Sequence, residues 1–269
     1  MLASGQPDFP FCLCWANQTW SGIWHGNPRK VLIEQTYPGL DDHRRHFEYL
    51  LTAFRDPRYV RVDGKPLLAI YQPLDIPDVA RVMAFWRDLA VQAGLPGLHL
   101  VGMRSHQTDW TPEADGFDAL CTEGLPAPRP WVSMRTPLKW ARRKLAERLG
   151  RPTVYKYGEV MANVVPPQRP GVVSYPTVIP NWDNTPRSGA RGIVLHGSTP
   201  ELFRAHVRQA LDARRDVPPE RNLVFIKSWN EWAEGNHLEP DLRFGRQYLE
   251  VLRDECAARG TGTPTAPRG

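Results

Sequence analysis

The sequence predicts an α/β fold of the (β/α)8 TIM-barrel type that is incomplete, because about six βα units are present where a complete barrel has eight. Three observations predict it. Short apolar runs alternate with amphipathic helical stretches along the chain, which is the pattern of a parallel sheet whose strands are joined by helices. Several of the runs are apolar on both faces, as expected for strands covered on both sides. No glycine-rich phosphate turn follows the first run, which disfavours a Rossmann sheet.

The apolar runs predicted as strands cover residues 11–15, 66–72, 98–103, 117–121, 171–179 and 223–227. The fifth run is the weakest because Pro176 interrupts it, and proline cannot donate to a sheet. Helices are predicted where apolar residues recur with helical spacing, at residues 41–54, 77–93, 137–149, 199–214 and 241–259. We therefore expect one partial barrel domain over residues 1–259 and a disordered tail over residues 260–269.

Composition and charge indicate a globular protein and argue against a nucleic-acid partner, a signal peptide and a membrane span. The chain has 269 residues, of which 41% are hydrophobic and 23% charged, as in ordinary globular proteins. A net charge of +5 is too small to indicate a nucleic-acid partner. The N-terminus lacks a basic segment followed by an apolar core, and no run of about 18 apolar residues occurs. These features predict a cytoplasmic protein.

Aromatic, amide and acidic residues follow the predicted strands. In a barrel, the loops after the carboxyl ends of the strands carry the chemistry. Aromatic rings stack on sugar faces, and amides hydrogen-bond to hydroxyl groups. A carbohydrate-binding site is therefore predicted at these positions: Trp15, Asn17, Trp20, Tyr71, Glu123, Trp182, Asp183, Asn184, Arg187, Asn230 and Trp232.

The segment NLVFIKSWNEWAEG (residues 222–235) contains the candidate catalytic pair, Glu231 and Glu234. If the chain turns helical after Ser228, these two side chains share a face. Carboxylates held close together repel, so one of them tends to keep a proton. One protonated and one ionised carboxyl group is the arrangement that glycosyl chemistry requires. The alternative interpretation is that both acids favour the N-terminus of a following helix.

Other chemistries lack their signatures. Neither a G-x-S-x-G turn nor a G-x-x-x-x-G-K-[ST] loop occurs. His43 and His46 are not followed by a carboxylate-histidine metal pattern, so neither a metal nor another cofactor is predicted. Residues 135–151 contain seven basic residues and one acid, Glu147. Such a run is usually a solvated helix face. A second hypothesis is peripheral contact with anionic lipid or with a pyrophosphate-linked glycan carrier.

Five motifs support a family assignment. They are PFCLCWANQTW, VLIEQTYPG, FRDPRYVRVDGKPLLAIYQP, PNWDNTPR and FIKSWNEWAEGNHLEPD, in this order. Together they resemble the WbsX-type glycosyltransferase family, which is related to glycoside hydrolase family 99 (endo-alpha-mannosidase-like), and the resemblance covers about residues 8–252. It implies a barrel enzyme that acts on a glycan or lipid-linked oligosaccharide in surface polysaccharide, O-antigen or lipopolysaccharide biosynthesis.

The resemblance also implies roles for the acidic pair. Glu231 matches the carboxylate that acts as base on the sugar 2-hydroxyl, which gives a 1,2-anhydro intermediate and net retention. Glu234 matches the general acid and subsequent base. The chemistry needs neither metal nor nucleotide. Two residues depart from the family motifs and bear on the substrate. Gln18 stands where the family often has an acid, and His25 stands where the family commonly has the aspartate of a W-D-G motif.

The resemblance further implies that two βα units of the family precede Met1 and contribute to the sugar site. A barrel without them exposes sheet edges and apolar surface. We therefore expect a partner chain that supplies the missing strands. The alternative function is a catalytically incomplete glycan-binding or scaffold protein, which keeps the aromatic and amide residues but shows no turnover.

Overall fold

The computed structural model of the chain describes residues 1–22, 27–104, 110–122, 145, 148–162, 164–165 and 171–260. The chain divides into two units, Met1–Glu123 with Gln168–Tyr175, and Gly124–Pro167 with Pro176–Gly269. Several sequence predictions fall wholly or mostly outside the described residues. They are the site residue Glu123, the motif position His25, the helix predicted at 137–149, the basic segment 135–151 except residues 145 and 148–151, and the tail beyond residue 260.

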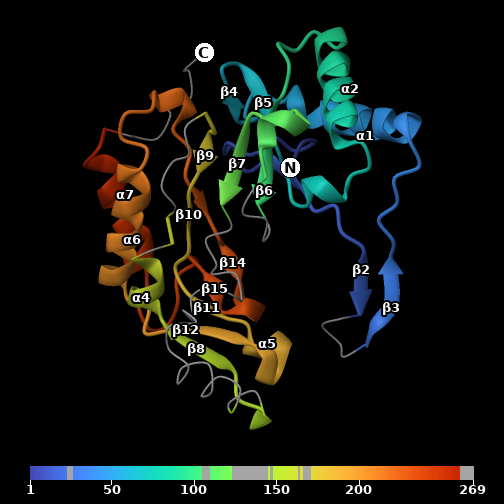
Figure 1. Cartoon of the computed structure of the whole chain (residues 1–269). Coiled ribbons are helices and arrows are strands. Elements are labelled where there is room, and N and C mark those ends of the chain that lie inside the picture. The colour runs from blue at the N-terminus through green and yellow to red at the C-terminus, as the bar shows by residue number, and fades with distance from the viewer. Residues whose placement is uncertain are drawn as a thin grey trace. The chain divides into compact units, whose positions relative to one another are not determined.

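The first unit is built on a parallel sheet (Figure 1). Its strands have the spatial order β1-β5-β6-β7-β9, which is also their order along the chain. The leucines at matching positions are in register, with Leu13 opposite Leu68 and Leu68 opposite Leu100. A short antiparallel strand, β4, pairs with the start of β5. The bounds are β1 Leu13–Trp15, β4 Arg61–Val62, β5 Lys65–Ile70, β6 His99–Arg104, β7 Ala119–Thr122 and β9 Ser174–Tyr175.

Two amphipathic helices cover one face of this sheet. They are α1 (Leu40–Phe54) and α2 (Val79–Gln92), and they confirm the helices predicted at 41–54 and 77–93. The buried core combines Leu68 and Leu100 of the sheet with Phe54, Met83 and Trp86 of the helices. Two short 3-10 turns also occur in this unit, η2 (Pro73–Asp75) before α2 and η3 (Pro112–Asp115) between β6 and β7.

An antiparallel hairpin of β2 (Trp20–Gly22) and β3 (Asn27–Ile33) reaches away from the helices of this unit (Figure 1). This hairpin was not among the predicted elements. Trp20, Val31 and Ile33 are exposed on this hairpin. The apolar residues of this segment therefore do not mark a buried face of the strands.

The second unit contains the second half of the fifth predicted strand and the sixth predicted strand. β10 (Thr177–Val178) and β13 (Phe225–Ile226) pair in parallel, with Thr177 opposite Phe225. The run at 171–179 forms two strands, β9 and β10, on either side of Pro176, as the missing N–H of proline requires. A further sheet, not predicted, has the order β11-β12-β8. Its strands are β11 Trp182–Asp183, β12 Ile193–His196 and β8 Thr153–Lys156.

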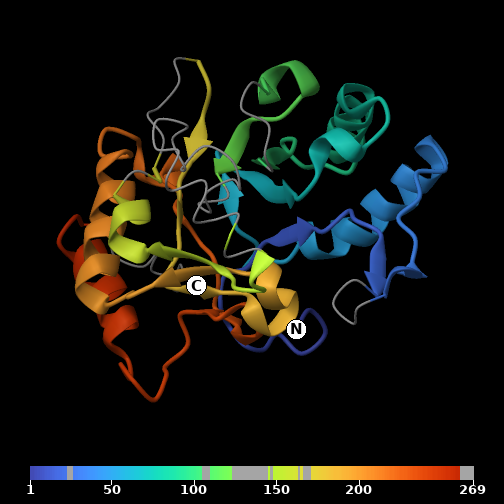
Figure 2. The same ribbon diagram turned by 60° about the horizontal axis from the view of Figure 1, so that its bottom comes forward.

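Helices α6 (Pro200–Asp212) and α7 (Gln247–Ala257) pack together in this unit (Figure 2). The predicted start of the first is confirmed, because the Thr199 hydroxyl accepts a hydrogen bond from the Leu202 N–H at 3.3 Å. Val178 of β10 lies in the same core as Phe203 and Val251 of these helices. The remaining bounds are α4 Tyr157–Met161, α5 Thr185–Ser188, η4 Gly189–Arg191 and η5 Pro219–Arg221.

The helix predicted from residue 241 begins later, at Gln247. The Asp241 carboxylate accepts hydrogen bonds from the N–H groups of Arg243 (2.8 Å) and Phe244 (2.6 Å). This side chain therefore holds residues 241–244 in a turn that competes with the helix.

The chain has an α/β fold with a mostly parallel sheet. Among the described helices, none combines the length and the apolar content needed to cross a bilayer.

Candidate functional site

The candidate acidic pair lies on a small hairpin that directly follows strand β13. Its strands are β14 (Asn230–Glu231) and β15 (Asn236–His237), joined by the 3-10 turn η6 (Trp232–Glu234) and by Gly235. The chain is therefore not an α-helix after Ser228, and the helical face considered for Glu231 and Glu234 does not exist. A hairpin replaces it because Gly235 adopts a left-handed conformation, with φ of 50°.

Polar side chains at the base of the hairpin hold its two strands together. The Ser228 hydroxyl accepts from the Glu231 N–H at 3.1 Å and donates to the Asn236 carbonyl at 2.7 Å. The fully buried Asn236 side chain donates to the carbonyls of Lys227 (2.8 Å) and Asn181 (2.7 Å). Through these two hydrogen bonds, Asn236 connects the end of β13 to the loop after β10.

One guanidinium group binds both members of the acidic pair. Arg187 Nη2 lies 2.8 Å from Glu231 Oε1, and Arg187 Nη1 lies 3.2 Å from Glu234 Oε1. The side chain of Glu231 is 39% exposed and that of Glu234 is 15% exposed. The two carboxylates therefore converge on one point, and a positive charge between them offsets the repulsion expected from the sequence.

Arg187 is positioned by the other residues of the PNWDNTPR motif. The Asp183 carboxylate accepts from the backbone N–H of Thr185 at 2.9 Å and from its hydroxyl at 2.6 Å. The Asn184 side chain accepts from the Ile193 N–H at 2.7 Å. These contacts fix the one-turn helix α5 that carries Arg187. Asp183 and Asn184, predicted as ligand-binding residues, are thus engaged in building this turn.

The turn and the hairpin touch at Gly235. A Cβ atom at this position would lie 3.0 Å from Cβ, N and O of Asp183. Only glycine permits this approach without a shift of the neighbouring backbone. The contact keeps the Arg187 turn next to the acidic pair.

The predicted aromatic and amide residues of this unit differ in exposure. Trp182 is only 6% exposed, and Lys227 Nζ lies 4.8 Å from the centre of its ring. Trp232 is 47% exposed, stacks on His237 at 3.8 Å between ring centres, and donates to Glu239 at 2.8 Å. Asn230 is exposed on β14. Trp229, which was not among the predicted site residues, is also exposed beside the pair.

The predicted site residues of the first unit also differ. Asn17 is 1% exposed. Its amide donates to the Gln72 carbonyl (2.7 Å) and to the Tyr37 hydroxyl (2.9 Å) and accepts from the Gln72 N–H (2.8 Å). Its hydrogen-bonding capacity is used within the protein, where it joins the loops after β1 and β5.

The aromatic members of that set have other environments. Trp15 packs against His46 and Trp86, with 4.7 Å and 5.7 Å between ring centres. Tyr71 directly follows β5, and its N–H donates to the Trp15 carbonyl at 3.0 Å. Trp20 is exposed on the β2–β3 hairpin.

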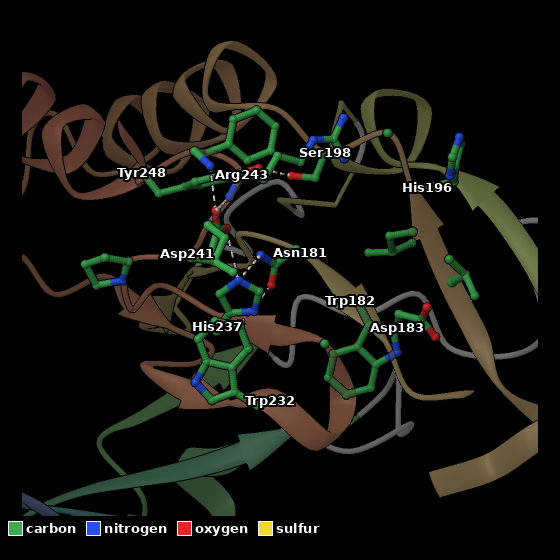
Figure 3. A pocket seen from close by; sticks show the side chains of 17 residues that line it. Asn181, Trp182, Asp183, His196, Ser198, Trp232, His237, Asp241, Arg243 and Tyr248 are labelled. Atoms are coloured by element: carbon green, nitrogen blue, oxygen red, sulfur yellow. Dashed lines mark hydrogen bonds and ion pairs between the residues drawn. The ribbon is translucent and has the colours of Figure 1, made fainter. Parts of the chain in front are cut away.

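A cavity of about 740 Å³ adjoins the acidic pair in the second unit (Figure 3). Trp232, Gly235 and Asp183 form part of its wall, whereas Glu231 and Glu234 do not line it. The pair and the cavity therefore share the hairpin as a common wall. In the part of the chain that the structure describes, no three His, Cys, Asp or Glu side chains converge as a metal site would require.

Comparisons with known proteins agree with the fold. A glycoside hydrolase-like protein matches 80% of this chain and 61% of its own, with 20% identity and a TM-score of 0.51. The GH99 endo-alpha-mannosidase from Bacteroides thetaiotaomicron matches 81% of this chain and 62% of its own, with 18% identity and a TM-score of 0.50. At these identities the likeness shows a shared fold.

Sequence relatives are closer. Two proteins called "Uncharacterized protein WxcX", from the B100 and ATCC 33913 strains of Xanthomonas campestris pv. campestris, are each 34% identical over 248 residues. The match covers 91% of this chain but 34% of each relative, so the chain spans about a third of their length.

The family model described as Glycosyltransferase WbsX matches residues 1–252, which includes the acidic hairpin and the Arg187 turn. The chain therefore belongs to the Glycosyltransferase WbsX family, a family of glycan-active enzymes.

Proposed function

We propose that the protein breaks and remakes a bond to the anomeric carbon of a glycan, with retention, and that Glu231 and Glu234 are its catalytic carboxylates. The proposed substrate class is a glycan or lipid-linked oligosaccharide of surface polysaccharide metabolism, as the resemblance to the WbsX family implies, and the proposed location is the cytoplasm. The observation that carries the proposal is the pair of contacts from Arg187 to both carboxylates, at 2.8 and 3.2 Å.

The surroundings of the two carboxylates differ. A nearby cation favours the ionised form of a carboxyl group, whereas burial favours the neutral form. Glu231 has the shorter contact with Arg187 and is the more exposed. Glu234 has the longer contact and is the more buried. The assignment of Glu231 as the base and Glu234 as the acid rests on the family resemblance.

The proposed reaction has two balanced steps. Glu231 removes the proton of the sugar 2-hydroxyl, O2 attacks C1, and the leaving oxygen takes the proton of Glu234, which gives a 1,2-anhydro sugar. Water or an acceptor hydroxyl then attacks C1 and gives its proton to Glu234, while Glu231 returns its proton to O2. Each step inverts C1, so the product retains the starting configuration. Water as acceptor gives hydrolysis, and a sugar hydroxyl gives transfer.

Exposed rings near the pair suit the sugar. Trp229 and Trp232 are both about half exposed on the same hairpin as the carboxylates. Flat aromatic surface beside a catalytic pair is suited to hold a pyranose ring by stacking. Trp182, Asp183, Asn184 and Arg187 contribute by shaping the site from the neighbouring loop.

The proposal extends to the complete barrel. The parallel strands of the first unit follow chain order, which is the strand order of a (β/α)8 barrel. We expect strands from another segment or partner chain to complete it. Trp15, Trp20, Tyr71 and Glu123 stay predicted glycan-binding residues, and the basic residues of 135–151 stay predicted contacts for a membrane-bound carrier.

Single substitutions test the catalytic pair. Glu231→Gln and Glu234→Gln keep the shape of the side chains but remove their charge, so turnover of a labelled oligosaccharide panel should fall at least 100-fold while glycan binding persists. Glu250→Gln, on the exposed face of α7, is the matched control. Native-like turnover by both site variants would refute the proposal. Binding without turnover by the native protein would favour the non-catalytic alternative.

A further inference from the structure

The cavity beside the acidic hairpin has its own chemistry. It lies between the loop after β10 and the start of α7, and its volume is about 740 Å³. The rings of Trp182, Phe244 and Tyr248 line it, together with the polar side chains of Ser198 and Arg243. Figure 3 shows Trp182 and Asp183 on one side of this space and Arg243, Ser198 and Tyr248 on another.

The acidic groups that line the cavity are engaged within the protein. One oxygen of Asp241 accepts from two backbone N–H groups, and the other lies 3.2 Å from His237 Nε2. Burial acts to raise the pKa of the Asp241 carboxyl, but these hydrogen bonds outweigh it and lower the pKa below its ordinary value. Asp183 accepts two hydrogen bonds from Thr185. The negative charges in the wall are thus compensated locally.

The cationic group is not engaged in this way. Among the residues that the structure describes, the Arg243 guanidinium makes no ion pair and no side-chain hydrogen bond, and it lies 4.8 Å from the centre of the Phe244 ring. Helix α7 begins next to it at Gln247 without a side-chain cap. The first N–H groups of a helix of 11 residues favour an anion.

The wall also contains unused polar groups. Trp182 Nε1 and His237 Nδ1 are buried and lack a hydrogen-bond partner among the described residues. Neither atom is accessible from the cavity, so both lie behind the surface of its wall. The cavity itself combines a cation without an ion pair among the described residues, a helix start without a side-chain cap and aromatic surface.

We propose that this cavity binds a sugar that carries an anionic group, a carboxylate or a phosphate. The anion lies against Arg243 and the start of α7, where a planar guanidinium can bind it through two parallel hydrogen bonds. The sugar ring packs against Trp182, Phe244 and Tyr248. The sugar part rests on the proposed function, whereas the anionic part rests on the cavity alone.

Calorimetric titration of the full chain tests this proposal with four probes: glucuronate, glucose 6-phosphate, glucose and inorganic phosphate. We expect at least one of the two charged sugars to bind at least tenfold more tightly than glucose and than inorganic phosphate. The tighter of the two charged sugars identifies the anionic group. Failure of both charged sugars to bind, or equal binding of glucose, would overturn the proposal, and inorganic phosphate binding as tightly as glucose 6-phosphate would overturn its sugar part.

Two arginine variants locate the site. Arg243→Gln should weaken binding of the charged sugar at least tenfold and leave the affinity for glucose unchanged. Arg246→Gln, an exposed neighbour that does not line the cavity, should change affinity less than twofold. Equal affinity of Arg243→Gln and the native chain would refute the assignment. The Glu231→Gln variant should bind the charged sugar normally, so failure of catalysis and failure of this site are distinguishable.

Discussion

Replacement of Arg187 by methionine removes the only group seen to touch both candidate catalytic carboxylates in the described part of the chain. The contact with the more exposed Glu231 resembles a surface ion pair, which contributes up to about 1 kcal/mol. The contact with the more buried Glu234 resembles a hydrogen bond to a charged group, which contributes about 1.5–3 kcal/mol. Arg187→Met should therefore lower the free energy of unfolding by about 2–4 kcal/mol.

Urea denaturation in a mutant cycle tests that value. The same substitution is made in the native chain and in a chain carrying Glu231→Gln and Glu234→Gln. Since the neutral amides do not repel, the cost of Arg187→Met should fall below about 1 kcal/mol in the second chain. Arg246→Met, at an exposed arginine, is the control and should cost less than about 0.5 kcal/mol in both. An equal cost of Arg187→Met in both chains would show that the three side chains are not coupled.

The same residue gives a kinetic prediction. Lysine keeps the positive charge but lacks the planar fork that reaches two carboxylates at once. Arg187→Lys should therefore retain much of the stability while turnover falls about 100-fold, since small displacements of catalytic groups have effects of this size. Turnover within twofold of the native rate would refute a positioning role for the guanidinium.

Three further predictions concern stability, measured by urea denaturation. Burial lowers the pKa of His206 from 6.5 to about 4. Between these pH values only the unfolded chain takes up the proton, so the free energy of unfolding falls by about 3 kcal/mol as the pH drops from 6.5 to 4. The His206→Leu variant should lack this loss, and an unchanged pH dependence in the variant would contradict the assignment. Gly235→Ala should lower the free energy of unfolding by about 2–4 kcal/mol, because of left-handed strain and the close approach to Asp183. Gly245→Ala should lower it less, since Gly245 has a φ of 55° but no neighbour within 4 Å. Equal losses in the two variants would argue against the contact. Asn17→Ala should cost about 2–4 kcal/mol because it leaves buried backbone groups unpaired, and a loss of glycan binding without a loss of stability would instead indicate a ligand role.

Long apolar runs explain why most of the framework was predictable. The run at 66–72 becomes β5, whose residues from Pro66 to Ile70 are buried. Burial on both faces requires continuous apolar sequence, and that requirement is visible without a structure. Helices α1 and α2 were predicted from the helical spacing of their apolar residues, because each helix buries one stripe against the sheet.

Short polar strands were missed. β11 and β14 contain two residues each, Trp182–Asp183 and Asn230–Glu231. Two residues show no periodicity, and their pairing depends on partners elsewhere, such as Trp182 opposite Leu195. The β14–β15 hairpin also depends on hydrogen bonds from Ser228 and Asn236, which spacing alone does not reveal.

The sequence by itself determined the α/β class, the principal strands and helices, the family motifs and the candidate pair Glu231 and Glu234. Only the tertiary structure decided that both carboxylates meet at Arg187, more than 40 residues earlier in the chain. It also decided that Asn17 is committed to the protein's own backbone. The physical reason is that periodicity reports which faces are buried, whereas the partner of a polar group depends on how distant loops fold back on each other.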